Sequence, residues 1–377
     1  MIKIDVEILS SSNAYERLCR QWNALATEDP ISLLGLDGTS TYEWFVAISQ
    51  AFPEAAESFV IVARSEGVAV GFLPLIVDRK SRFGPRLSAA TELYGGRNGP
   101  ILREPKSEVL SAMLGALDVA CPGWLTLQMT LRADSDTTNV LTHVLTSGGF
   151  RGNAVPHQES PFFPLLESAD KFKAGISKSA LQTIRTCRNK FAKIGPLRYR
   201  EYTHESEAAE LLEMVLAIER KSWKHEAGSA ITTRPRQLAF YRVLFPLAMK
   251  AKLLYAQVLF LEDEPIAYNF GLIHQLVFAC LKHSNIQDYD KLSPNYLLNE
   301  SLFEKLRGLG VVTVDWMGLA EPHKLRWSEH NSTYQRNTWV FYNRTLKARI
   351  FTFLQRQKKR LDRLRGLAAV PKRSSSE

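Results

Sequence analysis

The sequence runs through the same order of predicted elements twice, and this repetition constrains the fold more than any other feature. Each half holds an amphipathic helix with a tryptophan (Trp22 or Trp223), an alternating hairpin, a further helix and a short closing strand. By residue number the segments are 14–26, 59–65, 68–78, 107–120 and 124–131 in the first half, and 207–223, 253–261, 265–274, 295–310 and 311–317 in the second. Equal order at an offset of about 200 residues predicts duplication of one α/β unit, with coincidence between two generic units as the alternative.

The hairpins and the closing strands predict different kinds of pairing. Alternation of apolar and polar residues in both hairpins predicts antiparallel strands with one face on the core. The strand at 311–317 is β-branched and follows a helix, as in a parallel βαβ step. We therefore expect the α/β (α+β) class: tandem units, each with a mixed antiparallel and parallel sheet flanked by helices. The expected divisions are an N-terminal unit at 1–160, a C-terminal unit at 161–345 and a basic helical tail at 346–377, with the proline-rich segment 152–164 as the boundary.

The formal net charge of +9 favours acidic partners such as nucleotide phosphates, a carrier protein, RNA or a membrane surface. Much of the excess lies in 171–200 and in 347–372. The second stretch has apolar residues at helical spacing among dense cations. It is either a solvated terminal helix or a contact for a carrier protein, tRNA or anionic lipid.

Several classes of protein are disfavoured by what the sequence lacks. No apolar run approaches the length of a membrane helix, and the first residues lack the apolar core of a signal peptide. The four cysteines lie far apart without a CxxC pair, so a cytoplasmic location with reduced thiols is expected. No zinc spacing, Walker loop, GxSxG elbow or Rossmann fingerprint occurs, and no metal site is expected.

Seven stretches give the chain a family resemblance, and they follow one another in the family's order. They are 67–75 and 94–100 in the first half, and 177–199, 219–223, 263–272, 283–298 and 314–327 in the second. With them the sequence resembles the BioF2-like acetyltransferase group of the GNAT superfamily, which includes the CelD/BcsL proteins of polysaccharide (cellulose) biosynthesis. Through that group it also resembles the Fem aminoacyl-transferases.

The resemblance implies an acyltransferase that uses acyl-CoA or acyl-carrier protein as a co-substrate, with no permanently bound cofactor. The acceptor would be an amine or hydroxyl of a small molecule or saccharide unit, and the protein a monomer or homodimer. Two alternatives stay open: Fem-like transfer from aminoacyl-tRNA, which the basic stretches suit, and a non-catalytic binding or assembly protein with the same fold.

The donor site is expected where the strands 276–284 and 311–317 diverge, with phosphates at the N-terminus of the helix that follows. The expected cofactor-binding residues are Ser284, Asn285, Ser293, Asn295 and Tyr296. The family commonly has Ser-Pro-Gly where this chain has Ser293-Pro294-Asn295, and asparagine tolerates a left-handed backbone better than most residues.

Acyl transfer from a thioester needs a base for the nucleophile and an acid for the leaving thiolate. Asp315, at the end of its strand, is the first choice for the base or for orienting the nucleophile, and His283 is the second. Both could equally be structural residues. Tyr289 or Tyr296 could protonate the thiolate, and position alone does not choose between them.

Acceptor and anion contacts are expected from a further set of residues. These are Trp223, Arg185, Arg188, Gly318, Lys324 and Trp327. The family's Tyr-Lys pair is His323-Lys324 here. The basic helix with Arg185 and Arg188 is either a solvated surface or a phosphate grip. The N-terminal unit lacks an acid matching Asp315, so we expect it to be degenerate and to serve packing and acceptor binding.

Overall fold

The computed structural model describes residues 3–10, 16–27, 38–52, 57–89, 99–165, 170, 175–328, 330–354 and 357. The elements before the middle of the chain are β1 (Asp5–Leu9), α2 (Cys19–Thr27), α3 (Tyr42–Ala51), β2 (Ser58–Ser65), β3 (Val68–Asp78), β4 (Arg86–Ala89), β5 (Ile101–Leu102), α4 (Lys106–Gly115), α5 (Leu117–Ala120), β6 (Thr126–Arg132) and α6 (Asp136–Ser147). Those that follow are β7 (Arg151–Pro164), α8 (Lys178–Phe191), β8 (Leu197–Tyr202), α9 (Ala208–Arg220), α10 (Trp223–Glu226), α11 (Pro235–Lys250), β9 (Leu254–Leu261), β10 (Glu264–His274), β11 (Val277–Asn285), α12 (Pro294–Gly308), β12 (Thr313–Asp315), α13 (Pro322–Leu325) and β13 (Ser332–Tyr342).

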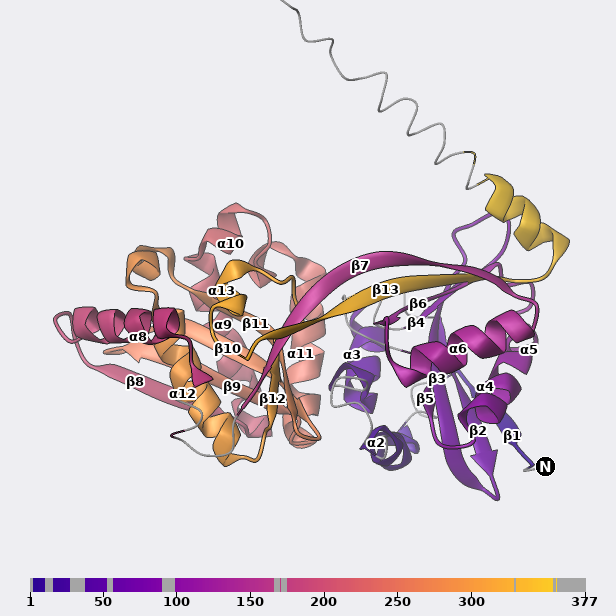
Figure 1. Ribbon diagram of the computed structural model, residues 1–377, viewed down its shortest axis with the longest axis horizontal. Coiled ribbons are helices and arrows are strands. Elements are labelled where there is room, and N and C mark those ends of the chain that lie inside the picture. Colours follow the sequence, from indigo (N-terminus) through magenta and orange to yellow (C-terminus); the bar gives the residue numbers. More distant parts are fainter. Residues whose placement is uncertain are drawn as a thin grey trace, which may run out of the picture.

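The strands form one continuous sheet in the order β1-β2-β3-β4-β6-β13-β7-β12-β11-β10-β9-β8 (Figure 1). The two ends of the sheet repeat the same pairing. β1, β2, β3 and β4 are antiparallel and β4 then pairs with β6 in parallel. At the other end β8, β9, β10 and β11 are antiparallel and β11 pairs with β12 in parallel. The expected mixed sheet flanked by helices is confirmed.

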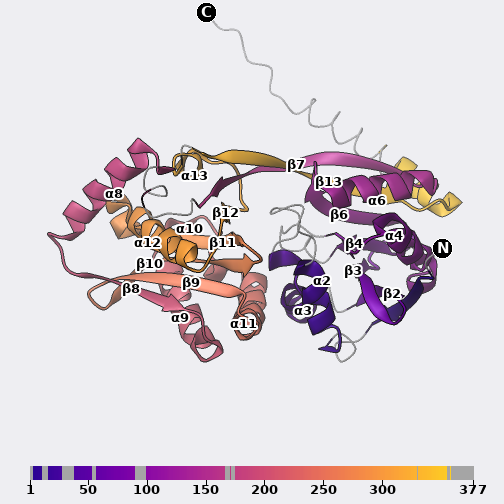
Figure 2. The same cartoon turned by 60° about the horizontal axis from the view of Figure 1, so that its bottom comes forward.

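Helices cover both faces of the C-terminal part of the sheet, with α12 on one face and α9 and α11 on the other (Figure 2). α8 packs on α12 through an apolar stripe that includes Ile184, Cys187 and Phe191. Ser177 begins α8 by accepting a hydrogen bond from the Ala180 N–H at 3.2 Å, which satisfies one of the free donors of the first turn.

β7 and β13 cross the centre of the sheet and lie between the two repeated parts (Figure 1). β7, from the first half of the chain, pairs with β12 of the second half, whereas β13 runs back to pair with β6. Over the rest of their length they pair with each other. The last strand of each half is therefore built into the other half of the sheet.

The segment 152–164, expected as a boundary because of its prolines, lies within this crossing strand. The ladder between β7 and β13 shifts register between Arg336 and Asn337, where the chain of β7 passes Pro156. A bulge of this kind accommodates a residue that cannot donate to the ladder. The expected boundary segment is therefore a strand, and it links the two parts of the sheet.

The core is also shared between the two halves of the chain. One cluster of buried side chains joins α2 and α3 to the helices and strands that follow β7. In it the ring of Trp44 on α3 meets Phe240 on α11 edge to face, with centroids 4.9 Å apart. A second cluster fills the space between β2, β3, β6 and the helices α4 and α6.

The expected tail is described only in part. Residues 346–354 are helical, and 355–356 and 358–377 lie outside the described residues, as do 94–98 of the stretch at 94–100. Within the part of the chain that is described, no helix combines the length and the apolar character needed to cross a bilayer.

Candidate functional site

β11 and β12 diverge, as the family resemblance implies. β11 runs to Asn285 along β10, yet it pairs with β12 only at Val277, Phe278 and Ala279. Because β12 ends at Asp315, the backbone of 280–285 has no strand partner on that side among the described residues. Such a gap leaves backbone polar groups free to bind a ligand.

A cavity of about 420 Å³ opens at this gap. Its lining comes from both diverging strand ends, from α10 and α13, and from the first half of the chain. The lining residues are Trp44, Gln158, Trp223, Lys224, Cys280, Leu281, Lys282, His283, Trp316, Met317, Gly318, Glu321, His323, Lys324 and Arg336.

One wall of the cavity is a tight turn after β12, held by several hydrogen bonds. Met317 has a left-handed backbone with φ 57°. Its carbonyl oxygen accepts hydrogen bonds from Gln158 Nε2 at 3.0 Å, Ser160 Oγ at 3.2 Å and an Arg336 amino group at 2.7 Å. At Gly318 a β-carbon would lie 2.6 Å from Lys324 Nζ, so glycine is needed for the lysine to reach this turn.

Asp315 stabilises this turn through hydrogen bonds and does not line the cavity. Its carboxylate is fully buried. Oδ1 accepts the Met317 N–H at 2.8 Å, and the Tyr334 hydroxyl donates to the carboxylate at 2.9 Å. The geometry therefore favours the structural alternative for Asp315 over the role of base, because its oxygens face Tyr334 and the backbone.

His283 lines the cavity. Its ring meets Trp316 edge to face, with centroids 5.7 Å apart, and its Nδ1 lies 3.8 Å from Cys280 Sγ. Burial, followed by the positive charges of Lys224 and Lys324, holds the pKa of His283 well below its usual range. The imidazole is therefore neutral at physiological pH, and its nitrogen lone pair can accept a proton, although the same surroundings make it a weaker base than an exposed histidine.

Lysines give the cavity a positive potential. Lys224 Nζ donates to the backbone carbonyl of His283, and burial together with Lys282 lowers the pKa of Lys224 to about 8. Lys324, itself buried, pairs with Glu321 at 3.0 Å. Cations around a partly closed space stabilise an anion or a developing oxyanion.

The third lysine of the cavity lining, Lys282, forms an ion pair with the buried carboxylate of Glu219. Lys282 Nζ lies 3.3 Å from Glu219, which is fully buried and accepts a 2.5 Å hydrogen bond from the Tyr268 hydroxyl. Burial lowers the pKa of Lys282, and the neighbouring Glu219 opposes that shift.

The residues expected to bind the donor gather around the turn between β11 and α12. Asn295 Nδ2 donates to Asn285 Oδ1 at 2.6 Å, and Asn285 Nδ2 donates to Asp290 Oδ1 at 2.6 Å. The left-handed residue is Ser293, with φ 52° and ψ 53°, whereas Asn295 is already helical. Ser284 is buried next to them in the sequence.

The basic helix α8 borders this turn. Lys190 Nζ donates to the Lys291 carbonyl at 3.2 Å, and Arg188 pairs with Glu300 of α12 at 2.6 Å. Arg185 is exposed on the same helix. Neither Arg185 nor Arg188 lines the 420 Å³ cavity.

Three expected aromatic residues lie elsewhere. Tyr289 donates to Glu264 at 2.9 Å, away from the cavity lining. Tyr296 stacks on Trp327, with centroids 5.4 Å apart, and Trp327 is buried in the core. Of the expected residues, the cavity thus brings together His283, Trp223, Gly318 and Lys324.

Sequence reasoning missed residues that reach the cavity from distant segments. Trp44 comes from α3, Gln158 from β7 and Arg336 from β13. Nothing local in the sequence marks these residues, because the crossing strands bring them to the site. Lys224 follows Trp223 directly and could have been found from that neighbour.

Comparisons with known proteins agree with this architecture. Residues 178–325 match the family model described as an acetyltransferase (GNAT) domain. The matched segment holds both β11 and β12 as well as α8 and α12. No curated protein matches the sequence.

Solved structures share the fold over nearly the whole chain. The crystal structure of FemX is similar with a TM-score of 0.62 at 9% identity, covering 88% of this chain and 96% of that one. A conserved protein of unknown function from Bacteroides thetaiotaomicron gives 0.59 at 12% identity, covering 91% and 100%. The C-terminal DUF2156 domain of a protein assigned as a lysylphosphatidylglycerol synthetase, from Agrobacterium fabrum, gives 0.51 at 12% identity, covering 90% and 96%. At these identities the likeness concerns the fold.

Proposed function

We propose that the protein transfers an acyl group from a thioester donor, acyl-CoA or acyl-carrier protein, to an amine or hydroxyl of a small molecule or saccharide unit. The observation that carries the proposal is the cavity at the divergence of β11 and β12, which puts an imidazole and several cations beside backbone that has no strand partner on that side among the described residues. The GNAT match over 178–325 supports the reaction class.

In the proposed reaction His283 is the base, in place of Asp315. The acceptor N–H or O–H loses its proton to the imidazole as the nucleophile adds to the thioester carbonyl. Lys224, Lys324 and free backbone N–H groups stabilise the oxyanion of the tetrahedral intermediate. The C–S bond then breaks, the new amide or ester forms, and the thiolate takes up a proton, which the imidazolium of His283 can return.

The donor is proposed to lie with its anionic end at the start of α12 and its thioester at the gap. The first turn of α12 offers N–H donors and a positive dipole, and Lys190 and Arg185 of α8 add charge nearby. Ser284, Asn285, Ser293, Asn295 and Tyr296 belong to this turn region.

The acceptor is proposed to enter past Trp223, whose side chain is 52% exposed at the cavity. An exposed aromatic ring is a platform for the apolar face of a sugar or ring-bearing substrate. Trp44 and Gln158 extend the wall from the first half of the chain. This agrees with a degenerate N-terminal unit at 1–160 that serves packing and acceptor binding beside a catalytic unit at 161–345.

The test is release of free thiol from a panel of acyl-CoA thioesters and acyl-carrier protein, with amine and sugar acceptors, for the wild type and His283→Gln. Thiol release that depends on both acceptor and His283 supports the proposal. The basic face of α8 would also suit a tRNA donor, as in the Fem-like alternative. A parallel assay therefore measures transfer of an amino acid from aminoacyl-tRNA. Transfer from tRNA alone would replace the thioester donor, and stoichiometric binding without turnover of any donor would make the chain a binding protein.

A further inference from the structure

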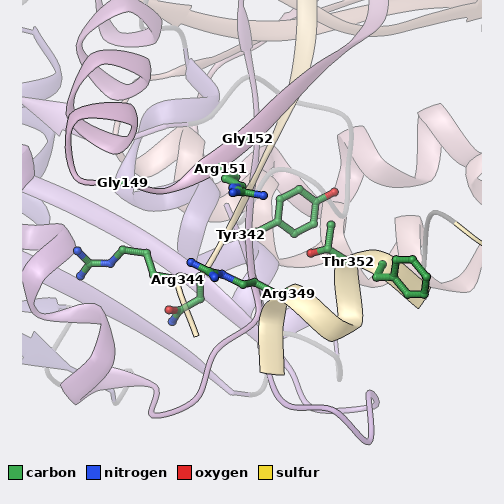
Figure 3. A pocket seen from close by; sticks show the side chains of 9 residues that line it. Gly149, Arg151, Gly152, Tyr342, Arg344, Arg349 and Thr352 are labelled. Atoms are coloured by element: carbon green, nitrogen blue, oxygen red, sulfur yellow. The ribbon is translucent and has the colours of Figure 1, made fainter. Parts of the chain in front are cut away.

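A second cavity of about 260 Å³ lies at the opposite ends of the crossing strands, beside the helix at 346–354 (Figure 3). Three arginines line it and no carboxylate does. The lining residues are Gly149, Arg151, Gly152, Tyr342, Asn343, Arg344, Arg349, Thr352 and Phe353.

None of these three arginines has a counter-charge among the described residues. Arg344 donates to the Gly148 carbonyl at 3.0 Å and lies over the ring of Phe150. The side chains of Arg151 on β7 and Arg349 on the helix make no ion pair or hydrogen bond to another described residue. Figure 3 shows both side chains in the same pocket as the Tyr342 ring, while Arg344 extends away. Two guanidinium groups that line one pocket without a carboxylate suit a phosphate-type anion.

The same helix carries an exposed apolar stripe. Leu346, Ile350, Phe353 and Leu354 are 73%, 48%, 59% and 42% exposed, and their spacing places them on one face. The opposite face is anchored by Ala348 and Phe351, which are buried against Leu125 and Phe83. A stripe of four large apolar side chains in water marks an interaction surface.

The residues that follow add positive charge. From 355 to 365 the sequence holds six lysines and arginines and a single acid, Asp362. Phosphate-binding arginines, dense cations and a facing apolar stripe are together the signature of a helix that lies in the interface of an anionic bilayer. RNA or an acidic protein would use the cations but would leave the apolar stripe in water.

We propose that this end of the molecule docks on an anionic phospholipid surface. The stripe enters the boundary between headgroups and acyl chains, and Arg151 and Arg349 bind lipid phosphate in the 260 Å³ pocket. This docking surface is separate from the acyl-transfer cavity, so it holds or fails independently of the proposed function.

The test is co-sedimentation of the full chain with vesicles of phosphatidylcholine alone or mixed with phosphatidylglycerol. Binding is expected only to the mixed vesicles, and it should weaken as salt rises. Removing charge with Arg151→Gln and Arg349→Gln should lower the partition coefficient roughly 5-fold for each arginine. Ile350→Ser with Phe353→Ser should lower it roughly 10-fold or more, because less apolar area is buried.

Two matched control substitutions lie far in sequence from the residues of the docking surface. Leu309→Ser removes another exposed apolar side chain, 60% exposed, and Arg242→Gln removes another exposed cation. Both controls should bind vesicles like the wild type. Equal binding to neutral vesicles, full binding by the stripe variant, or equal losses in the controls would each overturn the proposal. The proposal would also be overturned if the protein bound an RNA homopolymer but not the mixed vesicles, and if the stripe variant bound that RNA as well as the wild type does.

Discussion

At the scale of single residues, the cavity lining distinguishes two side chains that hold similar positions at strand ends in the sequence. His283 and Asp315 both end strands that border the gap, but only His283 lines the cavity. Asp315 instead closes the turn at Met317 and receives the Tyr334 hydroxyl. We therefore assign different consequences to their removal.

Replacing His283 with Gln keeps a similar size and removes the proton acceptor. We expect kcat to fall about 100- to 10,000-fold, as for loss of a general base, with an unchanged melting temperature. Because the pKa of His283 lies well below its usual range, wild-type activity should not decline between pH 7 and 6. His225→Gln is the control, since His225 is exposed and contacts Thr232. A variant that keeps full turnover would remove His283 from the mechanism.

Asp315→Asn should act mainly on stability. The change keeps the shape but weakens the buried hydrogen bonds from Tyr334 and Met317, at a cost of about 1–3 kcal/mol. Thermal unfolding should therefore shift downward while the folded fraction keeps most of its kcat. Asp263→Asn, in the hairpin turn, is expected to be nearly silent. A normal melting temperature with lost turnover would restore Asp315 as the base.

The Lys224→Met variant tests how much the burial of the Lys224 ammonium group destabilises the folded protein. The folded protein releases this proton at a pKa of about 8, against an ordinary value of 10.5. Between these values the unfolded chain binds more protons, so the wild-type free energy of unfolding rises with pH there. At pH 7 the gap between these pKa values corresponds to roughly 3 kcal/mol, so the variant should be more stable there by up to that amount, less the cost of the lost hydrogen bond to the His283 carbonyl, and the difference should shrink above pH 8. Urea unfolding between pH 7 and 10 measures it, and parallel curves for the two proteins would contradict the assignment.

At the scale of elements, the basic face of α8 gives a prediction about the donor. Arg188 is already paired with Glu300 across an exposed contact, so its loss should matter little. Arg185 is exposed on the same helix, two residues before Cys187, whose thiol lies 3.7 Å from the Ser293 carbonyl oxygen. Arg185→Gln should raise the donor KM roughly 5-fold at low salt and less at high salt, with Lys193→Gln as the control on the segment after α8. Unchanged donor kinetics at low ionic strength would make the helix a solvated surface.

The sequence predicted elements whose pattern is local and missed those whose role depends on distant partners. The hairpins and the parallel step of β12 follow from alternation and from the preceding helix, and the structure has them. The strand β7 was not predicted, because its prolines indicated only a boundary between units, and its strand structure depends on β13 as the partner and on the bulge. Likewise Trp44 and Arg336 reach the cavity only through tertiary packing.

At the scale of the whole molecule, the crossing strands make the two halves depend on each other. A fragment starting near Leu165 would hold nearly all of the expected C-terminal unit at 161–345. Such a fragment lacks β7, which pairs with β12, and leaves β13 without either partner. It also uncovers Phe240 by removing Trp44.

We therefore expect fragments 1–164 and 165–377 to be insoluble or to lack a cooperative transition when each is produced alone. Produced together, they should copurify and unfold in one transition, because the sheet and the shared core need both. Circular dichroism melts and copurification through a tag on one fragment measure this. A single sharp transition for 165–377 alone would show that the halves fold independently.

The crossing also fixes when the sheet can be completed during synthesis. Thr130 of β6 faces Thr338 of β13, a partner 208 residues later in the chain. At about 5–20 residues per second, roughly 10–40 s separate the emergence of these two strands from the ribosome. During that interval the edge of β6 awaits its final neighbour, and an unpaired edge is a template for association with other chains. We therefore expect this edge to stay open to other chains until Tyr342 has left the ribosome.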